Sequence, residues 1–159
     1  ASGRHRDATL RLVSTSDAAN AQSGVYPSGQ RIDQAMSEAA GLAAVAVRLT
    51  GLHPDAPRWR ALAARVLRRA TLELFEPDGW YVGHSLNYAR MTADQATLGL
   101  RWLAEGGERA PAAVLERLRR VFDLLLALAD GATGEVPNYG GNDGALVHPV
   151  STAPHPDFR

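Results

Sequence analysis

Two short segments carry most of the side chains in this sequence that could take part in chemistry. Segment 78–90 contains Trp80, His84, Asn87, Tyr88 and Arg90, and segment 136–145 contains Asn138, Tyr139 and Asn142. Imidazole, amide and phenol groups donate hydrogen bonds, and imidazole and phenol groups also transfer protons. Residues of these types can stabilise a negative charge that develops on a substrate and can move a proton to or from it.

The same residues also have a purely structural interpretation. His84, Asn87 and Tyr88 stand around a turn that enters a predicted helix, where polar side chains commonly cap the helix and residues three or four apart share a face. The Gly-Gly-Asn-Asp-Gly run at 140–144 is typical of a turn. It lacks the Lys-Ser/Thr of a phosphate-binding loop and the acidic spacing of an EF-hand. Residue types alone leave the catalytic and the structural interpretations open.

Composition argues against several classes of partner and site. The 17 basic residues are all Arg, they balance 17 acidic residues, and no stretch concentrates one sign, so we expect no nucleic-acid partner. The chain has no cysteine, which excludes disulfides, thiolate metal sites and thiol nucleophiles. His148, His155 and Asp157 are spaced irregularly among prolines, so we expect no metal site. The longest apolar run, 39–47, is too short to span a bilayer, so we expect no membrane insertion.

The elements that must position the two segments are predicted to be helices. The chain has 28 Ala and 20 Leu, whereas β-branched and aromatic residues are few and rarely alternate. Apolar residues recur at helical spacing over 31–50, over 56–76 after a possible cap at Asp55, over 86–104, and over 111–130 after Pro111. Residues 1–30 are expected to be irregular, and the proline- and glycine-rich tail from Gly131 is expected to be a loop system. The sequence therefore predicts an all-α fold.

Each predicted helix has an apolar face that is expected to point into the core. The inward positions are Met36, Ala39, Ala40, Ala43 and Val47; Trp59, Leu62, Val66, Leu67, Ala70 and Leu74; Met91, Leu98 and Trp102; and Val114, Leu118, Val121, Phe122, Leu125 and Leu126. Short connections favour antiparallel hairpins, as in bundles, α-solenoids or α/α toroids, and spacing does not separate these. His84 and Tyr139 are 55 positions apart with two helices between them. One antiparallel hairpin would return Tyr139 to the end of the fold where His84 lies.

The order of the motifs resembles that of the heparinase II/III-like polysaccharide lyases. The helical domain of that family carries Asp-Gly, His-Ser and Asn-Tyr, here at 78–79, 84–85 and 87–88, and later Pro-Asn-Tyr-Gly and Asn-Asp-Gly-Ala, here at 137–140 and 142–145. The Ser-Glu-Ala-Ala-Gly-Leu run at 37–42 and the final Asp157-Phe158-Arg159 are also similar to family elements. The resemblance therefore extends from about Ile32 to the last residue. Gln34 and Ala89 depart from it, because family members often carry histidine at these places.

The resemblance implies a fold, a reaction and a set of site residues. Residues 31–159 would be part of an incomplete α/α toroid in a longer parent protein that continues into a β-sandwich region. Family members cleave uronic-acid-containing polysaccharides, heparin-like or alginate-like, by β-elimination without a cofactor. A periplasmic or secreted location would follow, although no signal peptide is visible. The resemblance implies that His84, Asn87 and Tyr139 are catalytic and that Trp80, Tyr88, Arg90, Asn138 and Asn142 bind the acidic polysaccharide. The alternative is that Tyr88 is a packing residue and Arg90 a solvated helix cation.

Each implied catalytic residue fits a step of β-elimination. The C5 proton of a uronate is a weak acid because the adjacent carboxylate is already negative. Hydrogen-bond donors must therefore surround that carboxylate and stabilise the extra charge that develops on it as the proton leaves. The Asn87 amide and the His84 imidazole can supply such donors. The Tyr139 phenol can protonate the departing glycosidic oxygen, and with a lowered pKa it could also remove the C5 proton. A second base, which the family often supplies as another histidine, has no motif-matched position in this sequence.

The competing hypothesis is a helical scaffold or carbohydrate-binding module without catalysis. The two hypotheses differ in one structural expectation. A lyase requires His84, Asn87 and Tyr139 to converge on one open groove beside Trp80 or Tyr81, where a sugar ring can stack. Dispersed positions would favour the scaffold.

Overall fold

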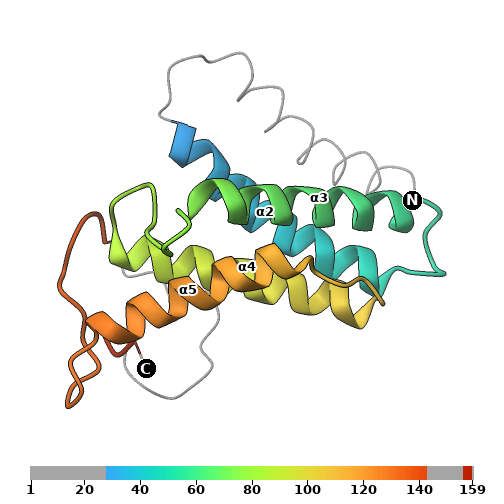
Figure 1. Cartoon of the computed structure of the whole chain (residues 1–159). Coiled ribbons are helices and arrows are strands. Elements are labelled where there is room, and N and C mark those ends of the chain that lie inside the picture. The colour runs from blue at the N-terminus through green and yellow to red at the C-terminus, as the bar shows by residue number, and fades with distance from the viewer. Residues whose placement is uncertain (1–27, 143–155, 159) are drawn as a thin grey trace.

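Four helices account for most of the described chain in the computed structural model, which describes residues 28–142 and 156–158 (Figure 1). They are α2 (Ser28–Arg48), α3 (Ala56–Leu74), α4 (Leu86–Glu105) and α5 (Ala112–Leu128). The only β pairing among the described residues is two isolated antiparallel bridges, Phe75–Tyr81 and Glu135–Asp157. The all-α prediction is confirmed.

Successive helices run antiparallel, so the chain forms two helical hairpins (Figure 1). α2 packs along both α3 and α4, and α5 packs against α4 and α3. The α2–α3–α4 contact is made largely by small side chains, among them Ala40, Ala43, Ala63, Ala93 and Ala96, all of which are buried. Small side chains let helix backbones approach closely, which explains the alanine-rich faces of the sequence.

Helix boundaries follow the prediction to within a few residues. α2 begins at Ser28 rather than residue 31 and ends at Arg48, so the expected irregular segment 1–30 is wrong for its last three residues. Asp55 occupies the N-cap position of α3, but its side chain makes no capping hydrogen bond. α3 ends at Leu74, before Pro77, because Phe75 turns into the extended pairing with Tyr81. The expectations for residues 1–27 and 143–155 lie outside the described residues.

The predicted core is confirmed for α2 and α3 in most positions and is wrong for α4. Val47, Leu62 and Val66 are half-buried rather than buried. In α4, Met91, Leu98 and Trp102 are half-buried, and the buried apolar positions are Leu86, Ala89, Ala93, Ala96, Leu100 and Leu103. The prediction favoured the largest apolar side chains. The middle of the helix instead turns Ala89, Ala93 and Ala96 inward, because it lies against α2 and α3 at close range, and leucines are buried only towards its two ends.

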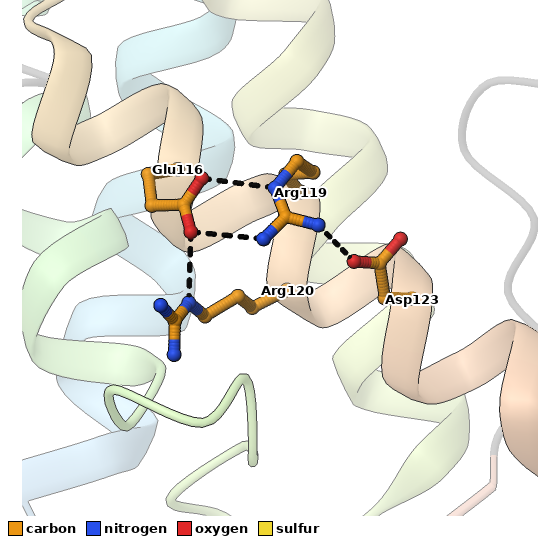
Figure 2. A network of polar contacts seen from close by, with 4 residues as sticks. All are labelled: Glu116, Arg119, Arg120 and Asp123. Atoms are coloured by element: carbon orange, nitrogen blue, oxygen red, sulfur yellow. Dashed lines mark hydrogen bonds and ion pairs between the residues drawn. The ribbon is translucent and has the colours of Figure 1, made fainter.

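The predicted inward face of α5 is too broad. Val114, Leu118, Val121 and Leu125 are buried, whereas Phe122 is 39% exposed and Leu126 is 63% exposed. α5 meets α3 and α4 along one side, and this contact covers only a narrow stripe of the helix. Its outer face carries a charged network in which Glu116 accepts hydrogen bonds from Arg119 and Arg120, and Arg119 also pairs with Asp123 (Figure 2).

None of the helices in the described part of the chain is both long and apolar enough to cross a membrane.

Candidate functional site

The first segment begins with a tight turn that is fixed against α5. Gly79 has φ +94°, and a Cβ atom added there would lie 2.5 Å from the backbone oxygen of Arg120. The turn therefore requires glycine both for its left-handed conformation and for its contact with α5. The Asp78 carboxylate accepts a hydrogen bond from the backbone N–H of Trp80 at 2.9 Å. Together these contacts fix the backbone from which the Trp80 side chain extends.

His84 lies in an exposed turn immediately before α4 and has a left-handed backbone with φ 52°. A positive φ is uncommon for a residue with a side chain, and it marks a constrained turn. The indole Nε1–H of Trp80 donates to Nδ1 of His84 at 3.2 Å. Because an indole nitrogen only donates, Nδ1 is the acceptor, and a neutral His84 carries its proton on Nε2. His84 then has an N–H donor on the atom opposite Trp80.

The second segment returns to this turn after α5, as the hairpin argument predicted. The backbone N–H of Leu86 donates to the carbonyl of Tyr139 at 3.1 Å, and the Ser85 hydroxyl donates to the carbonyl of Gly141 at 2.6 Å. Gly140, with φ +80°, lies between them, and a Cβ atom there would be 2.2 Å from the backbone oxygen of His84. The backbone of 139–141 is therefore in direct contact with that of 84–86.

This contact brings five of the predicted site residues together. The Trp80 and Tyr139 rings have centroids 6.0 Å apart at an interplanar angle of 50°. The Asn87 amide nitrogen lies 3.4 Å from the Asn138 side-chain oxygen, a long hydrogen bond. Tyr139 is 50% exposed, His84 and Asn138 are also exposed, and Trp80 and Asn87 are half-buried. Aromatic rings, amides, an imidazole and a phenol thus share one accessible region.

The other residues that were predicted to contact the substrate lie apart from that region or have a structural role. Tyr88 is half-buried, and its ring packs near Gly141, where an added Cβ atom would be 3.0 Å away. Tyr81 is buried and packs against Phe75, with ring centroids 5.6 Å apart, so it offers no stacking surface for a sugar. Asn142 is exposed at the end of the described loop.

Arg90 is buried, with 7% of its surface exposed, which excludes a solvated helix cation. Its guanidinium carbon lies 3.9 Å from the centre of the Phe158 ring, and Nη1 donates to the carbonyl of Asp157 at 3.1 Å. Burial lowers the pKa of Arg90, and the nearby Asp94 and Asp157 act in the opposite direction. The backbone N–H of Phe158 also bonds to the carbonyl of Gly134 at 2.9 Å. Arg90 therefore joins the C-terminal segment to α4.

Ser85 is the structurally central residue whose role the motifs did not reveal. It is 3% exposed, and its hydroxyl accepts from the backbone N–H of Tyr88 at 3.1 Å while donating to Gly141. A serine directly before the first residue of a helix is a known N-cap signal, and this signal could have identified half of its role. A small cavity with room for about one water molecule lies beside Ser85, lined mainly by Trp80, Leu86, Ala89 and Leu125.

Taken together, the geometry provides hydrogen-bond donors and a phenol beside a pair of aromatic rings, of which Tyr139 is exposed and Trp80 is half-buried. Such a surface suits a polar ligand with apolar faces, such as a sugar. In the described part of the chain, no group of three or more His, Asp or Glu residues could hold a metal ion. No protein-family model, curated protein or solved structure matches the chain.

Proposed function

We propose that this chain is part of a polysaccharide lyase that cleaves a uronic-acid-containing polysaccharide by β-elimination. The observation that carries the proposal is the convergence of Trp80, His84, Asn87, Asn138 and Tyr139, which come from two motifs separated by α4 and α5. The motifs resemble those of the heparinase II/III-like lyases in order and spacing. The incomplete α/α toroid of that family accommodates two antiparallel hairpins of the kind found here.

In the proposed reaction the C5 proton of the uronate leaves to a base, and its electron pair forms the C4–C5 double bond. The bond between C4 and the glycosidic oxygen breaks, and that oxygen takes up a proton. The Asn87 amide and the Nε2–H of His84 stabilise the charge that develops on the carboxylate. Tyr139 donates the proton to the departing oxygen. Family members often use a second histidine as the base that accepts the C5 proton, and no described residue stands at a motif-matched position for it.

A second candidate is a carbohydrate-binding module without catalysis. The accessible Trp80–Tyr139 pair favours it, because aromatic rings beside hydrogen-bonding amides bind sugars whether or not a reaction follows. The two candidates differ in their products. A binding module retains the polysaccharide unchanged, whereas a lyase leaves an unsaturated uronate that absorbs ultraviolet light.

The test is a panel of uronate polysaccharides, with and without sulfate, given to the full-length protein, with ultraviolet absorbance of the unsaturated product as readout.

Tyr139→Phe keeps the ring and removes the phenolic proton, so kcat should fall about 10²- to 10⁴-fold with little change in KM. Asn87→Ala should cost roughly 2.7 to 4 kcal/mol of transition-state stabilisation. Trp102→Phe, far along α4 where Arg48 stacks on the ring, is the control. Near-normal turnover by Tyr139→Phe would exclude the proton-transfer role.

A further inference from the structure

The Ser85 hydroxyl uses both of its hydrogen-bonding capacities at once. Its oxygen accepts the backbone N–H of Tyr88 at 3.1 Å, which caps the first turn of α4. Its single proton goes to the carbonyl of Gly141 at 2.6 Å, which belongs to the loop that follows α5. Since the residue is 3% exposed, solvent does not readily replace either partner. One buried side chain therefore starts a helix and holds a loop that is 56 residues away in sequence.

The loop is held at two neighbouring points. Leu86, the first residue of α4, donates its backbone N–H to the carbonyl of Tyr139 at 3.1 Å. Ser85 holds the carbonyl of Gly141, two residues further along the loop. Gly140 lies between these two carbonyls and touches the backbone of His84 and Ser85. Two fixed carbonyls on either side of a glycine define both the position and the orientation of the backbone that carries Tyr139.

We infer that Ser85 is a positioning residue, which sets the 139–141 loop against the start of α4 so that Tyr139 faces the same ligand as His84 and Asn87. This inference rests on the proposed function. His84 precedes Ser85 directly, and Asn87 lies in the first turn that Ser85 caps. The Ser85 hydroxyl therefore fixes both the turn that carries His84 and Asn87 and the loop that carries Tyr139. Proton transfer from Tyr139 requires such a fixed geometry.

Three substitutions separate helix capping from the loop contact. Ser85→Asp retains an oxygen that accepts the N–H of Tyr88 but has no proton for the carbonyl of Gly141. Ser85→Ala loses both hydrogen bonds, and Ser85→Thr retains both groups. The first readout is amide hydrogen exchange in this chain, because Leu86 reports the loop contact and Tyr88 reports the cap. Ser85→Asp should speed exchange at Leu86 about fivefold or more and leave Tyr88 protected, whereas Ser85→Ala should expose both.

The second readout is turnover by the full-length protein. Ser85→Asp should lower kcat at least tenfold with little change in KM, and Ser85→Thr should restore most of it. The inference is overturned if Leu86 remains protected in Ser85→Asp, or if its protection is lost while kcat stays normal. Turnover by the unsubstituted full-length protein distinguishes the two proposals. If it cleaves none of the uronate polysaccharides, the proposed function fails, whereas the exchange data still test the loop contact. If Tyr139→Phe retains full turnover on a substrate that is cleaved, Tyr139 is not the reacting group, and the positioning role of Ser85 is overturned.

Discussion

At the scale of single residues, the same side-chain type serves very different purposes in this chain. Arg90 is buried against the Phe158 ring and bonds to the carbonyl of Asp157, whereas Arg101 is exposed and lies 3.8 Å from Glu105 in the next turn of α4. A guanidinium can stack flat on a ring and still donate hydrogen bonds in its own plane, and an ammonium group cannot do both. Replacing the planar guanidinium by an ammonium group should therefore lower the stability of the fold at Arg90 and not at Arg101.

We expect Arg90→Lys to lower the free energy of unfolding by about 1 to 2 kcal/mol, because both the ring contact and the hydrogen bond to Asp157 depend on the guanidinium. Arg101→Lys should change it by no more than about 0.5 kcal/mol, since exposed i,i+4 pairs contribute little. Urea unfolding, monitored by circular dichroism, measures the free energy of unfolding of both variants. Equal effects of the two substitutions would show that the Phe158 contact contributes no stability.

The site was predictable from the sequence only in part. The types and order of His84, Asn87 and Tyr139 identified both segments, and counting helices between them indicated that they meet. The backbone contacts at Ser85 and Gly140 were not predictable, because they depend on which carbonyl lies opposite which hydroxyl after folding. The burial of Arg90 was missed for the same reason. Its aromatic partner, Phe158, is 68 residues away in the sequence.

At the scale of helices, the close approach of α4 to its neighbours depends on one glycine. A Cβ atom added at Gly99 would lie 2.8 Å from a methyl carbon of Leu67 and 3.1 Å from Cα of Ala40. Gly41, in α2, has nothing within 4 Å of the same position. These two helical glycines therefore differ in the space around them, although both occupy helix interiors where alanine has the higher helix propensity.

Gly99→Ala should lower the free energy of unfolding by about 1 to 2 kcal/mol, because crowding against Leu67 and Ala40 outweighs the propensity gain. Gly41→Ala should raise it by about 0.5 to 1 kcal/mol, since only the propensity gain applies. Thermal unfolding of the two variants beside the parent chain measures the difference. A stabilised Gly99→Ala variant would mean that α4 is not closely packed on α2 and α3.

Helix α5 should give the chain part of its response to acid. The side-chain hydrogen bond from Arg119, followed by that from Arg120, lowers the pKa of Glu116 from its ordinary value of 4.5 to about 2. A carboxylate with a depressed pKa stabilises the fold above about pH 4.5 and loses this contribution as the pH falls towards 2. The network is fully exposed, so salt should weaken the effect.

Glu116→Gln should therefore flatten the dependence of the unfolding temperature on pH between about 4.5 and 2, because it removes the group that titrates. Added salt should bring the parent chain closer to the variant. Glu105→Gln, at the more distant pair with Arg101, is the matched control. Thermal unfolding over this pH range is the measurement. Identical pH profiles for Glu116→Gln and the parent chain would contradict the prediction.

The helices themselves were predictable because each has a strong apolar period and clear start or stop signals, such as Pro111 before α5 and Gly106 after α4. The buried side of α4 was not predictable from the sequence. Large and small apolar residues both recur at helical spacing along this helix, and the distance from α4 to α2 and α3 decides which of them can be buried. In α5, Phe122 and Leu126 continue the apolar pattern but lie beyond the reach of the neighbouring helices.

At the scale of the whole molecule, two hairpins place the ends of α3 and α5 beside the start of α4, and this assembles the candidate site (Figure 1). The site consists of turns supported by helices, and the described residues include no second base at a motif-matched position. We therefore expect this chain alone to fold with a helical circular dichroism spectrum and to show little or no lyase turnover. Robust turnover by the chain on any uronate polysaccharide would place the missing base within it.

The contact between Trp80, His84 and Tyr139 has a practical consequence as an optical probe. Indole emission responds to the polarity around the ring and to a nearby imidazole, and Trp80 lies in the turn that the 139–141 loop covers. The other tryptophans are distant from this turn: Trp59 stacks on His53, and Trp102 lies beneath Arg48. Replacing both with phenylalanine would leave a chain whose remaining indole fluorescence reports whether the loop is docked, without any attached dye.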